Sequence, residues 1–140
     1  MDDANVALLL ARARIGIGLA AVVAPGFASK VLSGRPASGI EPFLARMLGA
    51  RDVTLGLGTV IALDRGAPVR GWLEASAVSD AADCVSSLLA QSRMSKRAFT
   101  GTVVLAAASA VTGGYLARRL DPPPPAHPNQ PEAVVTGHPE

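Results

Sequence analysis

Residues 48–58 read LGARDVTLGLG, and an arginine and an aspartate, Arg51 and Asp52, stand side by side in this otherwise apolar stretch. The surrounding run, 43–63, contains no proline. A helix of about 20 residues rises about 30 Å, which matches the hydrocarbon thickness of a bilayer. An unpaired charge at the bilayer centre costs about 3 kcal/mol. If this run spans a membrane, its two charges therefore need partners.

The composition of the chain favours a membrane environment. Apolar residues make up 49% of the 140 residues, and charged residues make up 17%. Soluble domains carry about 25% charged residues, and a small domain has a large surface to cover with them. The formal net charge is only +2. Since no cluster of basic and aromatic residues accompanies it, we predict no nucleic-acid partner.

Prolines help to divide the chain into four apolar runs. Because proline breaks the interior of a helix, each proline-free run predicts one helix. We predict an all-α fold, namely a four-helix transmembrane bundle over residues 1–120 of a multi-pass cell-membrane protein. A disordered proline-rich tail at 121–140 follows it. The predicted spans are 6–24, 43–63, 71–91 and 98–117.

The alternative is a soluble helical bundle whose charges lie on solvated faces. The uncharged run 98–117 argues against it, since soluble helices of that length usually carry a charged stripe. The run 71–91 is the weakest span, because it contains Asp80 and Asp83. Its polar residues share one helical face, which we expect to lie against protein; they are Ser76, Ser79, Asp80, Asp83 and Ser87.

Six charges lie near the midpoints of the first three runs: Arg12, Arg14, Arg51, Asp52, Asp80 and Asp83. At 1.5 Å per residue they fall within about 5 Å of one mid-membrane layer. Three are positive and three are negative, so we predict a neutral structural charge network that holds the helices in register. Because successive helical residues point 100° apart, we expect Arg51 and Asp52 to diverge. One would face the acidic pair, and the other would face Arg14 or a partner subunit.

Small residues recur at four-residue spacing within the runs. In lipid, such residues let helix backbones approach closely and gain dispersion contacts. One series in the first run comprises Gly16, Ala20 and Ala24. The glycines for which we predict a helix-packing role are Gly49, Gly56, Gly58 and Gly113.

The segment ARMLGARDVTLGLG at 45–58, followed by DAAD at 80–83, resembles a family of small four-span actinobacterial membrane proteins. That family is known as a domain of unknown function. The resemblance covers about residues 6–117. It rests on an R-x-x-G-x-R-D pattern whose residues here are Arg46, Gly49, Arg51 and Asp52. The resemblance implies a four-span fold and the importance of these residues, and it implies no activity.

No pattern typical of catalysis occurs in the predicted bundle. His127 and His138 both lie in the tail, and Cys84 has no histidine to activate it. No metal-binding spacing is present. We therefore predict a non-catalytic protein with no cofactor and no metal.

The predicted role is an accessory or stabilising subunit of a larger membrane complex, for example a cell-envelope lipid transporter. Its partners would be the lipid bilayer and other integral membrane proteins. The alternative is a small proton- or ion-coupled transporter or channel that uses Asp80 and Asp83, because ionisable residues inside a membrane are functional candidates. The neutral set favours the structural role, since a carrier keeps a carboxylate free to change its protonation.

Overall fold

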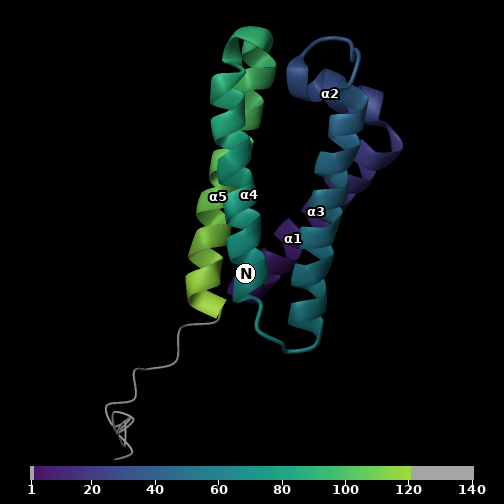
Figure 1. Cartoon of the computed structure of the whole chain (residues 1–140). Coiled ribbons are helices and arrows are strands. Elements are labelled where there is room, and N and C mark those ends of the chain that lie inside the picture. The colour runs from purple at the N-terminus through teal and green to yellow at the C-terminus, as the bar shows by residue number, and fades with distance from the viewer. Residues whose placement is uncertain (1, 121–140) are drawn as a thin grey trace, which may run out of the picture.

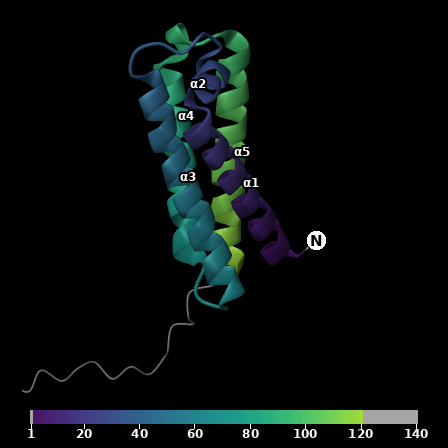
Figure 2. The ribbon, with the colours of Figure 1, turned by 90° about the vertical axis from the view of Figure 1, so that its right-hand side faces the viewer.

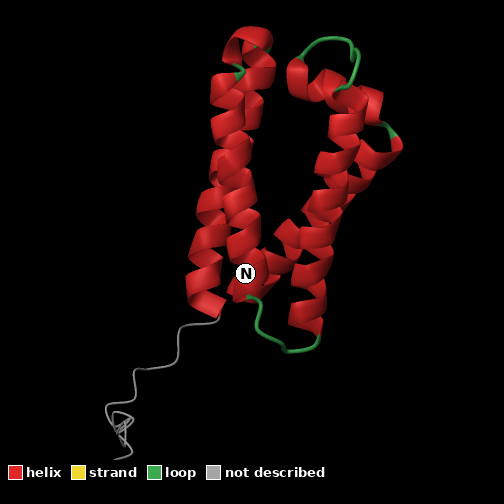
Figure 3. Ribbon diagram, in the orientation of Figure 1, coloured by secondary structure: helices red, strands yellow, loops and turns green. Residues whose placement is uncertain are grey.

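The computed structural model describes residues 2–120, and every regular element in this part of the chain is helical (Figure 1). The all-α prediction is confirmed for these residues (Figure 3). The predicted tail lies outside them. The elements are α1 (Asp3–Val23), α2 (Pro25–Ser33), α3 (Glu41–Asp64), α4 (Arg70–Leu89), the 3-10 turn η1 (Gln91–Arg93) and α5 (Lys96–Leu120).

Helix α2 is an element that the proline pattern did not predict. Pro25 is its first residue. A proline at this position loses no helical hydrogen bond, and its fixed φ suits the first turn. The chain therefore bends at Ala24 and continues as a second helix. That helix ends at Gly34, whose φ of 73° is a left-handed conformation that glycine adopts without strain.

The long helices associate as two antiparallel pairs. Helices α1 and α3 pack along most of their length, as do α4 and α5, whereas contacts between the pairs are fewer. In Figure 1 the α4–α5 pair lies to the left of α3, and α1 passes behind. Figure 2 shows α1 crossing obliquely in front of α5. The two pairs must therefore be joined at particular places.

Contacts at both ends of the molecule join the pairs. At the end that holds the N-terminus, all four long helices contribute to or pack against one apolar core. It contains Ala7, Ala62, Val69, Leu73, Leu116 and Ala117. Arg119 Nε donates to Asp3 Oδ2 at 3.2 Å at this end. At the opposite end the backbone N–H of Ser95 donates to the carbonyl of Ser33 at 3.0 Å.

Small side chains face the interior, and many large apolar side chains face outward. The buried positions of α1 are Ala7, Ala11, Gly18 and Ala21. Large apolar residues are exposed on all five α-helices of the described chain, among them Ile17, Phe27, Met47, Ile61, Val78, Leu89, Val104 and Val111. In a soluble bundle the large apolar side chains usually fill the core, whereas few of those in the described residues are buried.

Two helices of the described chain, α1 and α5, are long and apolar enough to cross a membrane. Only 22% of the α1 segment and 17% of the α5 segment is buried, so neither is the enclosed central helix of a soluble domain. The charged helices α3 and α4 do not reach this level of hydropathy. Length and composition therefore identify two candidate spans, whereas four were predicted.

Candidate functional site

Five charged side chains near the middles of α1, α3 and α4 form one continuous chain of ion pairs, here called the charge chain. Its order is Asp80, Arg14, Asp52, Arg51, Asp83. Negative and positive groups alternate, so each arginine lies between two carboxylates. The charge chain connects the α1–α3 pair to the α4–α5 pair.

Arg14 joins three helices. Its Nη1 donates to Asp52 Oδ1 of α3 at 2.8 Å, and its Nη2 donates to Asp80 Oδ2 of α4. Arginine presents its donors in a fixed planar fork, so one guanidinium can hold two carboxylates at a defined angle. Arg14 therefore fixes the position of α1 against α3 and α4.

Arg51 makes the second link between α3 and α4. Its two terminal nitrogens bind Asp83 in a bidentate pair, with distances of 3.0 Å to Oδ1 and 2.7 Å to Oδ2. Arg51 Nη2 also donates to Asp52 Oδ1 at 3.0 Å. Arg51 therefore faces the acidic pair and Asp52 faces Arg14, which is one of the expected arrangements, but the two side chains also contact each other. The arginine side chain is long enough to reach across the 100° between adjacent residues.

Helix α4 supplies both ends of the charge chain. Asp80 and Asp83 are three residues apart, which places them on one helical face. Ser76 and Ser87 are buried, as is Asp80. The polar face predicted for this helix therefore turns at least partly inward. Its position follows directly from the spacing of polar residues in the sequence.

The exposure of the side chains rises along the charge chain. It is 9% for Asp80, 15% for Arg14 and 18% for Asp52. At the other end it reaches 30% for Arg51 and 26% for Asp83. One end is therefore enclosed by protein, and the other end is open. No buried side-chain nitrogen or oxygen within the described residues lacks a hydrogen-bond partner.

Arg12 does not belong to the charge chain. It is exposed, and it forms no ion pair with a residue that the structure describes. Arg12 and Arg14 lie 200° apart around α1, so only one of them can face α3 and α4. Without Arg12 the set contains two cations and three anions. Its formal charge is −1, which corrects the neutral balance expected from the sequence.

The R-x-x-G-x-R-D residues all contribute to interhelical contacts. Arg46 Nε donates to the carbonyl of Val22 at 3.4 Å, at the C-terminal end of α1. Gly49 lies against the backbone of Gly18. Asp52 binds Arg14, and Arg51 binds Asp83. The motif is thus the part of α3 that fixes α1 and α4.

The glycines chosen from the sequence differ in how closely they pack. A Cβ on Gly56 would lie 2.7 Å from the carbonyl oxygen of Ala11, and one on Gly58 would overlap the Trp72 ring. A Cβ on Gly113 would lie 3.4 Å from its neighbours, which is an ordinary contact, so close approach does not require glycine there.

The small-residue series of the first run lies on the exposed face of α1. Gly16, Ala20 and Ala24 are exposed, and Gly16 has open space around it. Gly18, on the other face of α1, packs against Gly49 of α3. Four-residue spacing finds a face of small residues, but it does not show which face is covered.

The side chains of the charge chain can form ion pairs and exchange protons. Arginine stays protonated in proteins, so only the carboxylates can change their charge. No group of three His, Cys, Asp or Glu side chains within residues 2–120 is arranged to hold a metal ion.

Comparisons of the chain with family models, with curated proteins and with solved structures gave no match.

Proposed function

We propose that the chain is a four-span integral membrane protein and a non-catalytic accessory subunit of a larger membrane complex. The outward-facing large apolar residues and the small interior residues support the membrane role, because helices in lipid associate through small residues. The spans would be α1, α3, α4 and α5. A place in the four-span actinobacterial family, based on the R-x-x-G-x-R-D pattern, is part of this proposal.

The charge chain supports α3 and α4 as spans despite their low hydropathy. An isolated helix would place its charges in lipid without partners. Here the carboxylates of α4 are bound by Arg14 and Arg51, and Asp52 lies between them. Pairing removes much of the cost that would keep each helix out of the membrane alone.

The position of Arg12 is the main support for the role as a subunit. It lies near the middle of α1, faces outward and has no ionic partner among the described residues. An outward-facing arginine at the depth of the acyl chains is costly unless an anionic group meets it. A carboxylate in a transmembrane helix of another subunit would satisfy it, and a cell-envelope lipid transporter is one candidate host complex.

Size analysis after mild detergent extraction tests this proposal. The native protein should resist extraction by alkaline carbonate and should then migrate in a complex whose protein mass, after subtraction of bound detergent, exceeds its own 14.2 kDa chain. Arg12→Gln should release the chain from that complex. The matched control is Arg65→Gln, since Arg65 is also exposed but lies at a helix end. Carbonate extraction of the native protein, or a native protein that migrates as a lone monomer, would contradict the proposal.

The surplus carboxylate favours a second candidate function, a proton-coupled transporter or channel. Two arginines cannot neutralise three aspartates, so one carboxylate can gain or lose a proton without a new counterion. Structural charge sets do not need such a surplus.

A flux measurement separates the two candidates. The protein would be reconstituted in vesicles that contain a pH-sensitive dye. A carrier should lose flux in Asp80→Asn while the variant still accumulates and folds, and Glu74→Gln on the exposed part of α4 should retain flux. Disappearance of Asp80→Asn from the membrane would indicate a structural role instead.

A further inference from the structure

The end of the molecule formed by α2, η1 and the start of α5 carries an unbalanced positive charge. Five basic residues and one acidic residue, Glu41, lie in segments 30–41 and 91–98, a net charge of +4. We call the basic residues the basic end; they are Lys30, Arg35, Arg93, Lys96 and Arg97. All five are exposed, and none forms an ion pair with a described residue.

The opposite end is balanced. Segments 2–3, 64–74 and 118–119 hold four arginines and four acidic residues, and two of these arginines are paired. Arg70 binds Glu74 at 2.7 Å, and Arg119 binds Asp3 at 3.2 Å. The two ends therefore differ in charge, although they carry similar numbers of basic residues.

One contact gathers the basic end into a single place. The Ser95 N–H donates to the Ser33 carbonyl at 3.0 Å, and a Cβ on Gly34 would lie 2.6 Å from the Ser95 Cβ. Arg93, Lys96 and Arg97 lie within two residues of Ser95, while Lys30 and Arg35 lie within three residues of Ser33. Segments that are about 60 residues apart in sequence thus lie together at this end.

Helix α2 gives the basic end an apolar border. Its Pro25 and Ser29 are buried, whereas Phe27 and Val31 are 69% and 57% exposed beside the exposed Lys30. A short helix with a basic residue among outward-facing apolar residues is typical of a segment at the boundary between headgroups and acyl chains. Binding of an acidic protein or a nucleic acid would not require exposed apolar residues beside the basic ones.

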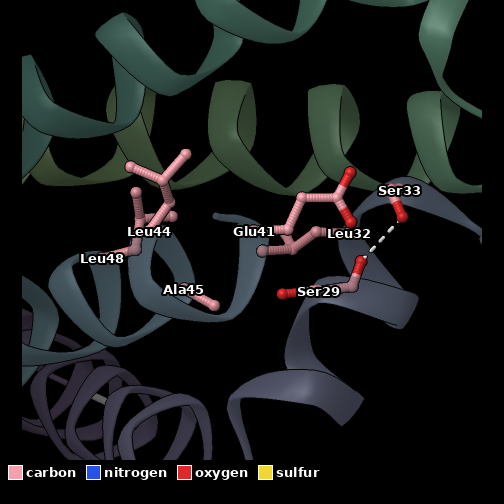
Figure 4. A pocket seen from close by; sticks show the side chains of 7 residues that line it. All are labelled: Ser29, Leu32, Ser33, Glu41, Leu44, Ala45 and Leu48. Carbon is pink, nitrogen blue, oxygen red and sulfur yellow. Dashed lines mark hydrogen bonds between the residues drawn. The ribbon is translucent and has the colours of Figure 1, made fainter. Parts of the chain in front are cut away.

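An apolar pocket of about 160 Å³ lies between α2 and α3 at this end (Figure 4). Its polar groups already have partners: the Ser29 and Ser33 hydroxyls donate to the Pro25 and Ser29 carbonyls, and Glu41 accepts from the Ser38 N–H. The remaining lining is apolar, from Leu32, Leu44, Ala45 and Leu48. This lining suits part of an acyl chain.

We propose that the basic end binds the phosphate headgroup of an anionic phospholipid, with part of an acyl chain in the α2–α3 pocket. The site rests on the proposed membrane function. It also gives the molecule an orientation, since the basic end would face the more anionic leaflet.

Titration of the full-length protein in mild detergent with short-chain lipids tests this site. Dihexanoyl phosphatidylglycerol should bind, and dihexanoyl phosphatidylcholine should bind at least tenfold more weakly. A basic residue close to anionic lipid contributes about 1 kcal/mol, or about fivefold in affinity. The double variant Lys96→Gln/Arg97→Gln should therefore weaken phosphatidylglycerol binding by about 25-fold. Lys30→Gln/Arg93→Gln should do the same.

The matched control is Arg65→Gln/Arg118→Gln, which removes two exposed charges from the other end and should leave binding unchanged. Equal loss in both kinds of variant, or equal binding of the two lipids, would overturn the proposal. Displacement of the lipid by an equal concentration of inorganic phosphate would indicate a free-phosphate site and would also overturn it. If carbonate does not extract the protein but the lipids bind alike, the headgroup site fails while the membrane role stands.

Discussion

Gly18 of α1 and Gly49 of α3 face each other across a contact that has no room for a side chain. A Cβ on Gly18 would lie 2.6 Å from the Gly49 carbonyl oxygen, and a Cβ on Gly49 would lie 2.5 Å from that of Gly18. Two turns along, Gly56 meets Ala11 in the same way. Arg14 and Asp52 lie between these two contacts, so close backbone approach brings them within hydrogen-bond distance.

Gly49→Ala should destabilise the protein by about 1–3 kcal/mol, because the new methyl group must push α1 away from α3. Thermal unfolding in detergent, followed by circular dichroism, measures the change. Gly16→Ala is the matched control on α1, since no atom lies within 4 Å of its added Cβ. Alanine favours helix over glycine, so this control should be neutral or slightly stabilising. Equal losses in the two variants would show that the close contact does not matter.

Arg14 and Arg12 should respond very differently to substitution. Arg14→Leu leaves Asp80 without its arginine and Asp52 with only one, and breaking a buried ion pair in this way costs about 3–5 kcal/mol. Arg12→Leu should change the stability of the isolated protein by less than about 0.5 kcal/mol, as exposed substitutions generally do. Unfolding of both variants in the same detergent provides the comparison. A similar cost for both would place Arg12 in the charge chain.

Double-mutant cycles should reproduce the order of the charge chain. Arg14 with Asp80, and Arg51 with Asp83, are direct pairs and should show coupling energies within about 0.5–3 kcal/mol. Arg51 with Asp80 is not a direct pair, so its coupling should be smaller. Alanine variants of each residue and of each pair, unfolded under one set of conditions, give the three values. Stronger coupling between Arg51 and Asp80 than between the direct pairs would contradict this order.

Trp72 should report on the packing of α3 against the start of α4. It is the sole tryptophan of the chain, and an added Cβ at Gly58 would overlap its ring. Gly58→Ala should push the indole outward and shift its fluorescence emission to longer wavelength. Gly71→Ala changes the residue next to Trp72, but its Cβ would meet no atom within 4 Å. Emission that moves in the control, or stays fixed in Gly58→Ala, would count against this contact.

Much of the helical layout could be predicted from the positions of proline and the lengths of the apolar runs. The predicted run 43–63 corresponds to Glu41–Asp64, and the run 71–91 corresponds to Arg70–Leu89. The proline pattern does not predict helix α2, because it places the end of a helix at Pro25, whereas a proline at the first helical position starts a helix.

The face that each helix turns inward was harder to predict. The spacing of Asp80 and Asp83 places them on one face of α4. The polar residues around them indicate that this face packs against protein. No such pattern distinguishes Arg12 from Arg14, or Gly16 from Gly18. In α1 both members of each pair are equally compatible with an apolar helix. The choice depends on how α1 is rotated against α3, which is a property of the folded molecule.

The positions of the charge chain along the sequence have a consequence for biosynthesis, if the protein enters a membrane as proposed. The α1–α3 portion leaves the ribosome first and holds Arg14, Arg51 and Asp52, one positive charge in excess. Helix α4 follows with two carboxylates, and the arginines that neutralise them lie in helices that were synthesised earlier. Its insertion by the translocation machinery therefore depends on a completed α1–α3 pair. A nascent chain with an incorrectly paired first half should stall at this helix.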